Sequence, residues 1–107
     1  RVGVNEFEVR LEGRRRLLIA GPMTLSTAPD WRQRLQAATD ATGDMEVDLS
    51  GVSAIDASAI QSLVCLRQRA RDSARRLRLL APSTCVHEAL DFCHLSEFFE
   101  IPRASRP

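Results

Sequence analysis

Four short stretches of the chain have the apolar pattern of β-strands. Apolar and polar residues alternate over residues 7–11, and residues 17–20 are apolar on both faces. The turn-like residues 12–14 lie between them and predict a β-hairpin. Residues 45–49 alternate as a third strand, and residues 77–81 form a short fourth strand.

Three longer stretches repeat their apolar residues at the period of an α-helix. The first covers residues 25–38, with Thr27 as the expected N-cap and Asp30 close behind it, where an acid favours the start of a helix. The second runs over residues 57–74, and the third begins after Ser83 as its cap. The residues expected to face the core from these helices are Trp31, Leu35, Ala38, Ala59, Leu63, Leu66, Ala70, Ala74, Val86, Leu90 and Cys93.

The order of the elements is strand, strand, helix, strand, helix, strand, helix. The third and fourth strands are joined through a helix, so they should run parallel and lie next to or near each other. The sequence therefore predicts an α/β fold, a mixed four-stranded sheet with helices chiefly on one face. At 107 residues the whole chain forms a single domain, with residues 1–5 and 102–107 expected to fray.

Composition argues against several classes of partner. The net charge is +1, so neither a nucleic acid nor an anionic membrane is an evident ligand. No apolar run approaches the ~18 residues that a membrane-spanning helix needs, so we expect no direct insertion into a membrane.

All fifteen basic residues are arginine, and six of them crowd into residues 67–78 together with a single aspartate. This run is consistent with a solvated helix face, an acidic protein partner or a nucleic acid. A nucleic acid is disfavoured, because no aromatic residue is interleaved with the arginines.

Cys65, Cys85 and Cys93 have apolar neighbours in the sequence and are odd in number, which favours reduced thiols in a cytoplasmic protein. Their histidine neighbours, His87 and His94, raise the question of a metal site. Residues one or two apart on a helix point in different directions, so these four side chains cannot converge on one ion. We expect no metal, no other cofactor and no Cys–His nucleophile.

The stretch VDLSGVSAIDASAIQSLV, residues 47–64, resembles the signature of STAS domains, the family of bacterial anti-sigma-factor antagonists, which typically reads V-D-L-S-x-V-x-x-I-D-S/T-x-G-L-x-x-L. Residues 77–99 are similar to the fourth strand and terminal helices of that family. Gly21-Pro22-Met23-Thr24 stands where the family usually has Gly-Glu-Leu-Asp. The residues that match the signature are Val47, Asp48, Leu49, Ser50, Val52, Ile55, Asp56, Ile60 and Leu63.

The resemblance implies a protein-interaction module of bacterial signalling and transcription regulation rather than an enzyme. Its partner would be an anti-sigma factor, which can also be a serine kinase, or a related regulator. An alternative that the resemblance also allows is a small subunit of a phospholipid-transport ABC complex, docking on the ATPase through the same helix. The implied contact residues are Ser53, Asp56, Ala57, Ser58 and Ile60, with Met23 and Thr24 from a neighbouring loop.

The sequence departs from the family pattern at the residue after Asp56. The resemblance places a phosphorylated Ser or Thr there, but this chain has Ala57, which carries no hydroxyl. Ser58 is the nearest alternative acceptor, although one step along a helix turns a side chain by ~100°. A simpler interpretation is that Asp56 and Ser58 cap the helix that follows.

Overall fold

The computed structural model describes residues 6–11, 14–39 and 43–102. The elements follow the predicted order, with one short 3-10 helix added before the first α-helix. They are β1 (Glu6–Leu11), β2 (Arg14–Met23), the 3-10 helix η1 (Leu25–Thr27), α1 (Ala28–Thr39), β3 (Met45–Ile55), α2 (Ala57–Asp72), β4 (Leu77–Leu80) and α3 (Thr84–Phe92).

The four strands form one mixed sheet in the order β1-β2-β3-β4. β1 pairs antiparallel with β2, which confirms the predicted hairpin, although residues 12 and 13 of its turn lie outside the described residues. β3 pairs parallel with both β2 and β4. The parallel β3–β4 pair, joined through α2, is the arrangement that the sequence predicted.

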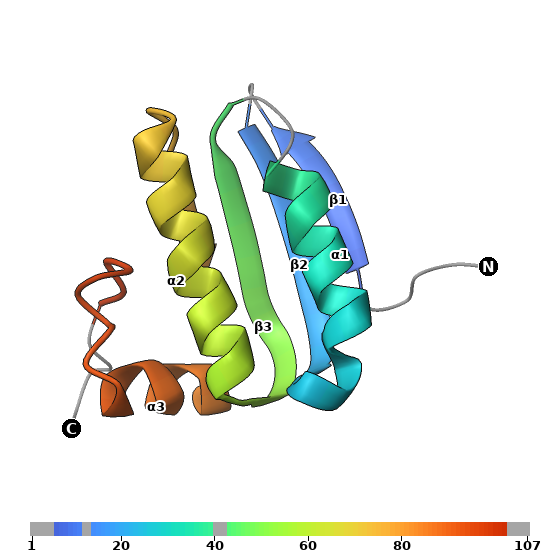
Figure 1. Ribbon diagram of the computed structural model, residues 1–107, viewed down its shortest axis with the longest axis vertical. Helices are drawn as coiled ribbons and strands as arrows, with labels where there is room; N and C mark the ends of the chain where they lie inside the picture. The colour runs from blue at the N-terminus through green and yellow to red at the C-terminus, as the bar shows by residue number, and fades with distance from the viewer. Residues whose placement is uncertain (1–5, 12–13, 40–42, 103–107) are drawn as a thin grey trace.

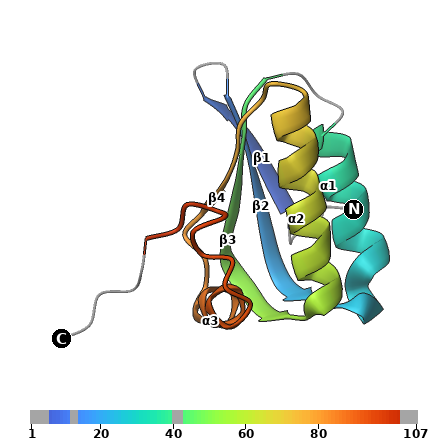
Figure 2. The same ribbon diagram turned by 60° about the vertical axis from the view of Figure 1, so that its left-hand side comes forward.

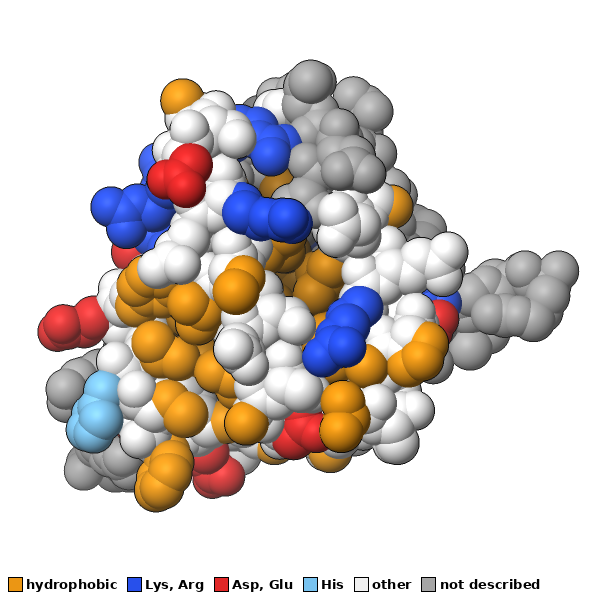
Figure 3. Space-filling model, in the orientation of Figure 1, with side chains coloured by type: hydrophobic (Ala, Val, Ile, Leu, Met, Phe, Trp, Pro, Cys, Tyr) orange, Lys and Arg blue, Asp and Glu red, His pale blue; other side chains and the backbone are white. Residues whose placement is uncertain are grey.

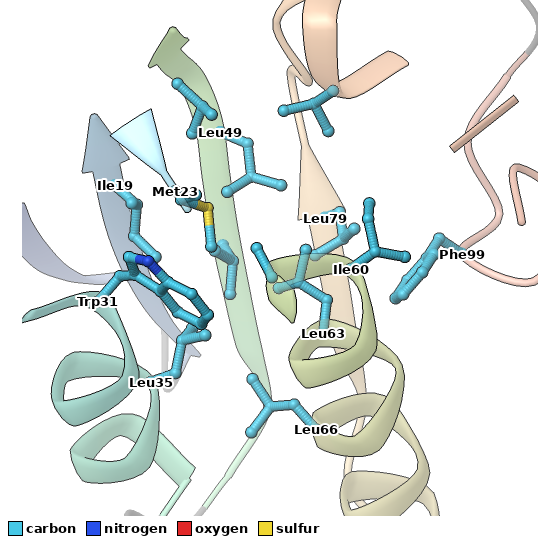
Figure 4. Close-up of a cluster of buried hydrophobic side chains, with 14 of the residues drawn as sticks. Ile19, Met23, Trp31, Leu35, Leu49, Ile60, Leu63, Leu66, Leu79 and Phe99 are labelled. Carbon is cyan, nitrogen blue, oxygen red and sulfur yellow. The ribbon is translucent and has the colours of Figure 1, made fainter. Parts of the chain in front are cut away.

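Two of the three helices cover one face of the sheet, as predicted. α1 and α2 lie side by side there, whereas α3 lies beyond the start of α2 near the β4 edge (Figures 1 and 2). Trp31 and Leu35 from α1 meet Leu63 and Leu66 from α2 over the buried side chains of the central strands (Figure 4). The C-terminal segment closes this core with Phe99, which is 2% exposed.

β2 and β3 are both longer than the sequence pattern indicates. β2 continues through Gly21 and Pro22 to Met23, and β3 continues beyond the predicted residues 45–49 to Ile55. The pairing of β2 with β3 shifts register twice, at Leu18/Ala20 and again at Gly21/Pro22. β2 and β3 pair with each other along these added residues. This pairing keeps the chain extended at Gly21-Pro22, although Gly-Pro by itself favours a turn.

The start of the first helix was assigned wrongly. Thr24, not Thr27, is the extended residue that precedes the helical segment, because η1 comes before α1. The Thr27 hydroxyl lies inside η1 and donates a hydrogen bond of 2.8 Å to the carbonyl of Pro22. Asp30 does lie in the first turn of α1, where it pairs with Arg34 at 2.8 Å.

Two residues assigned to the core lie past the ends of their helices. α2 ends at Asp72, and Ala74 is exposed with a positive φ of 58°. α3 ends at Phe92, so Cys93 is its exposed C-cap residue. The 3.6-residue period continued in the sequence beyond the point where the backbone stops being helical. The side chain of Ala38 lies outside the described residues.

Candidate protein-interaction site

Asp56 is the single residue between β3 and α2, and it caps that helix. Its backbone is extended, with φ of −125°, which directs its carboxylate back over the first turn. Its Oδ1 atom accepts hydrogen bonds from the Ser58 amide at 3.0 Å, the Ala59 amide at 3.3 Å and the Ser58 hydroxyl at 2.6 Å. These bonds satisfy amide groups that have no partner within the helix. The capping role predicted for Asp56 and Ser58 is therefore present.

The same carboxylate also joins α2 to η1. The Leu25 amide donates to Asp56 Oδ2 at 2.8 Å, and the Asp56 amide donates to the carbonyl of Met23 at 3.2 Å. Hydrogen bonds from the Ser58 hydroxyl, the Leu25 amide and the first amides of α2 hold the pKa of Asp56 below its ordinary value. Asp56 therefore fixes the start of α2 against the end of β2, and it does so as a carboxylate.

The residues implied as contacts lie together at this end of the sheet, but they differ in exposure. Ser53 and Ala57 are exposed, and Thr24, Asp56 and Ser58 are partly exposed. Met23 is 0% exposed and Ile60 is 7% exposed, and both belong to the hydrophobic core. In this conformation those two residues support the surface from beneath and offer a partner almost no area.

An exposed apolar residue that the sequence analysis did not select lies at the same place. Leu25 is 64% exposed, and its amide is the one bound by Asp56. It was overlooked because it was assigned to the regular first helix, where an apolar residue raises no question. The hydrogen bond to Asp56 depends on how β2 and β3 are paired, which no local pattern contains. We call Thr24, Leu25, Ser53, Asp56, Ala57 and Ser58 the helix-mouth surface.

A shallow groove of about 310 Å³ runs from this surface between α1 and α2. Ser58, Ser62 and Cys65 line it from α2, and Arg32 and Arg69 lie along its walls. The face that carries α1 and α2 has apolar side chains at its centre with arginines around them (Figure 3). The groove thus presents hydroxyls and a thiol from α2 between the two arginines.

The cysteines are not core residues as a group. Cys65 and Cys93 are exposed, and Cys85 is partly buried with its thiol 3.4 Å from the carbonyl of Val52. No cluster of three or more His, Cys, Asp or Glu side chains suited to a metal ion forms within residues 6–11, 14–39 and 43–102. None of the helices in those ranges has the length and apolar character needed to cross a bilayer.

The family model described as "Mlab, STAS domain" matches residues 7–100 of this chain. The chain therefore belongs to the STAS domain family, which confirms the resemblance drawn from residues 47–64. No curated protein matches the chain.

Solved structures share this fold. An anti-sigma factor antagonist from Mycobacterium paratuberculosis is 17% identical, with a TM-score of 0.75 over 92% of this chain and 85% of the other. The Bacillus cell fate determinant SpoIIAA in its phosphorylated form is 15% identical, with a TM-score of 0.67 over 94% of this chain and 92% of the other. A sulfate transporter family protein from Wolinella succinogenes is 21% identical, with a TM-score of 0.68 over 85% of this chain and 75% of the other. At these identities the likeness concerns the fold alone.

Proposed function

We propose that this domain is a non-catalytic protein-interaction module of bacterial signalling that binds an anti-sigma factor or a related regulator in the cytoplasm. The observation that carries the proposal is that the Asp56 carboxylate accepts hydrogen bonds from both η1 and α2 and so links the two elements. It holds exposed Leu25 and Ala57 in fixed positions before any partner arrives. A surface that is already ordered loses little conformational entropy on binding.

The chemistry of the surface supports binding rather than turnover. The Ser58 hydroxyl donates to Asp56, and the Asp56 carboxylate accepts four hydrogen bonds from within the domain. Neither group is left to act on a substrate. STAS domains are generally non-catalytic regulators, and the similar structures include anti-sigma factor antagonists.

Copurification from the native host tests the proposal. The wild-type domain should recover a protein that mass spectrometry identifies as an anti-sigma factor, kinase or related regulator. Ala57→Asp should lose that protein, because it places a second negative charge beside Asp56 on the helix-mouth surface. Gln33→Asp is the matched control, since it adds the same charge at an exposed position of α1. Equal recovery by both variants would contradict the assignment of this surface.

A second candidate function uses the same surface. The matching family model is named for Mlab and not for an anti-sigma factor antagonist. We therefore keep the other role that the resemblance allows, a small subunit of a phospholipid-transport ABC complex that docks on the ATPase. The copurified protein separates the two, because an ATPase recovered by wild type and lost by Ala57→Asp would select the transport role.

A further inference from the structure

The last turns of α2, the start of β4 and the C-terminal segment line an open pocket of about 440 Å³. The C-terminal segment passes α2 on the side away from α1 (Figure 1), and residues of both line the pocket. Four arginines and two glutamates line it together with an aliphatic and an aromatic side chain. The lining residues are Arg67, Arg71, Arg75, Arg76, Leu77, Glu97, Phe98 and Glu100.

Arg67 is held rigidly in the wall of this pocket. Its side chain is 12% exposed, and its two terminal nitrogens donate to the Leu77 carbonyl and to Glu100 Oε2, each at 2.8 Å. Its guanidinium also lies 5.4 Å from the ring centre of Phe98. The buried Nε atom has no hydrogen-bond partner among the described residues. Arg67 is therefore occupied by internal partners, and its contacts hold Glu100 and Phe98 in place at the pocket wall.

Glu100 shows that the pocket accommodates a carboxylate. Its Oε2 atom is bound by Arg67, and its Oε1 atom lies 3.8 Å from Arg76. The hydrogen bond from Arg67 and the positive charges of Arg67, Arg76 and Arg78 lower the pKa of Glu100. The chain thus supplies one carboxylate of its own to a wall that contains more arginines than acids. Arg71 is exposed one helical turn from Arg67, on the same ridge of α2.

We propose that this arginine-walled pocket is a second interaction surface, which binds an acidic peptide segment of a protein through carboxylate–arginine pairs at the exposed Arg71 and Arg76. Guanidinium groups match carboxylates in shape as well as charge. The partly buried Phe98 provides an apolar wall for the aliphatic parts of the bound side chains. The inference does not depend on the helix-mouth surface, which lies at the other end of α2.

The shape and charge of the pocket favour a peptide over other anions. A volume of about 440 Å³ is large enough for a few side chains of a peptide. Glu97 and Glu100 would repel a dense row of phosphates at the wall. A peptide can place its carboxylates beside the arginines and keep its backbone clear of the two glutamates.

Fluorescence anisotropy with a fluorescein-labelled hexaglutamate peptide tests the proposal on the full chain. Arg71→Gln/Arg76→Gln should weaken binding by about tenfold, since each exposed ion pair contributes up to ~1 kcal/mol. The charge-matched control is Arg32→Gln/Arg69→Gln, which removes two arginines from the α1–α2 groove and should leave binding within about twofold of wild type. Glu100→Gln should tighten binding, because it removes the competing internal carboxylate.

Several outcomes would overturn the proposal. They are undetectable peptide binding by wild type, equal losses in the two double variants, and weaker binding by Glu100→Gln. Preferential binding to phosphatidylglycerol vesicles or to duplex DNA would assign the pocket to a phosphate ligand instead. Arg71→Gln alone keeps the test valid if the double variant fails to fold, because Arg71 is exposed. That single change should still weaken binding by about threefold.

Discussion

The first turn of α2 and its last turns have different chemical surroundings. At the first turn, Asp56 and Ser58 form hydrogen bonds with each other and with nearby amides. The side chains of Leu25 and Ala57 are exposed there. At the last turns, arginines outnumber the acids that line the same pocket. Polar groups that are satisfied internally favour contact by shape and apolar burial. Excess charge favours an oppositely charged ligand and makes binding sensitive to salt. The same helix can therefore present two surfaces with different partners.

Gly51→Ala should have the largest effect on stability. Among the two binding surfaces, it should weaken only the helix-mouth surface at the first turn of α2. A Cβ at Gly51 would lie 2.8 Å from the Cβ of Ala20 and 3.3 Å from its Cα, inside the extended β2–β3 pairing that leads to Asp56. We expect a loss of ~1–3 kcal/mol in the free energy of unfolding, measured by urea denaturation. Ala20→Gly/Gly51→Ala should recover most of that loss. If Gly51→Ala weakens hexaglutamate binding as much as binding at the helix-mouth surface, the two ends are not independent.

Asp56 variants should separate the contribution of the α2 cap to stability from that of the hydrogen bond to η1. Asp56→Ala removes both and should lower the melting temperature by roughly 5 °C. Asp56→Asn keeps an oxygen that accepts hydrogen bonds from the Ser58 and Ala59 amides. Its side-chain nitrogen cannot accept the hydrogen bond that the Leu25 amide donates in wild type. The asparagine variant should therefore melt between wild type and Asp56→Ala, as followed by circular dichroism. Identical melting of wild type and Asp56→Asn would show that the Leu25 hydrogen bond contributes nothing to stability.

Acid should weaken both ends of α2, beginning with the arginine-walled pocket. The pKa of Glu100 is lowered from 4.5 and that of Asp56 from 3.8, so each group stabilises the fold fully above its ordinary value. As the pH falls below 4.5 the contribution of Glu100 declines, and below 3.8 that of Asp56 declines too. When the free energy of unfolding is measured against pH, the decline below 4.5 should be absent in Glu100→Gln. The further decline below 3.8 should be absent in Asp56→Asn. Unchanged curves in both variants would contradict these assignments.

Ser58 should show the smallest effect. Its hydroxyl makes one hydrogen bond to Asp56, so Ser58→Ala should cost about 1 kcal/mol or less in chemical denaturation. Because Ala57 has no hydroxyl and the Ser58 side chain points in a different direction on the helix, we expect no phosphate on wild type after incubation with a kinase partner and ATP. Ala57→Ser should restore a phosphorylatable site. An intact-protein mass showing phosphate on wild type but not on Ser58→Ala would make Ser58 the switch.

The part of this account that the sequence could predict is the part encoded locally. The strand and helix periods placed the four strands, the three α-helices and the parallel β3–β4 pair, and the Asp56 cap followed from its position between them. The extension of β2 past Gly21-Pro22 could not be predicted, because it depends on the register of β3. The exposure of Leu25 and its link to Asp56 follow from that register. Burial of Met23 and Ile60 likewise depends on how the layers pack.

The arginine run over residues 67–78 is a second case in which the sequence showed the residues but not what they contact in the fold. Its i, i+4 spacing on a helix was visible in the sequence, and an acidic protein partner was one of three interpretations. The sequence did not indicate that Glu97, Phe98 and Glu100 fold back beside these arginines. That contact turns a charged helix face into a pocket, which is why the run alone could not decide between a solvated surface and a binding site.

The most direct test of the central claim is the affinity of the copurified partner for three purified domains, measured by isothermal titration calorimetry. We predict that Ala57→Asp binds at least about tenfold more weakly than wild type, because its carboxylate lies beside Asp56 in the contact, and that Gln33→Asp binds as wild type does. An Ala57→Asp domain that binds as tightly as wild type, or a Gln33→Asp domain that is weakened equally, would contradict docking through the start of α2.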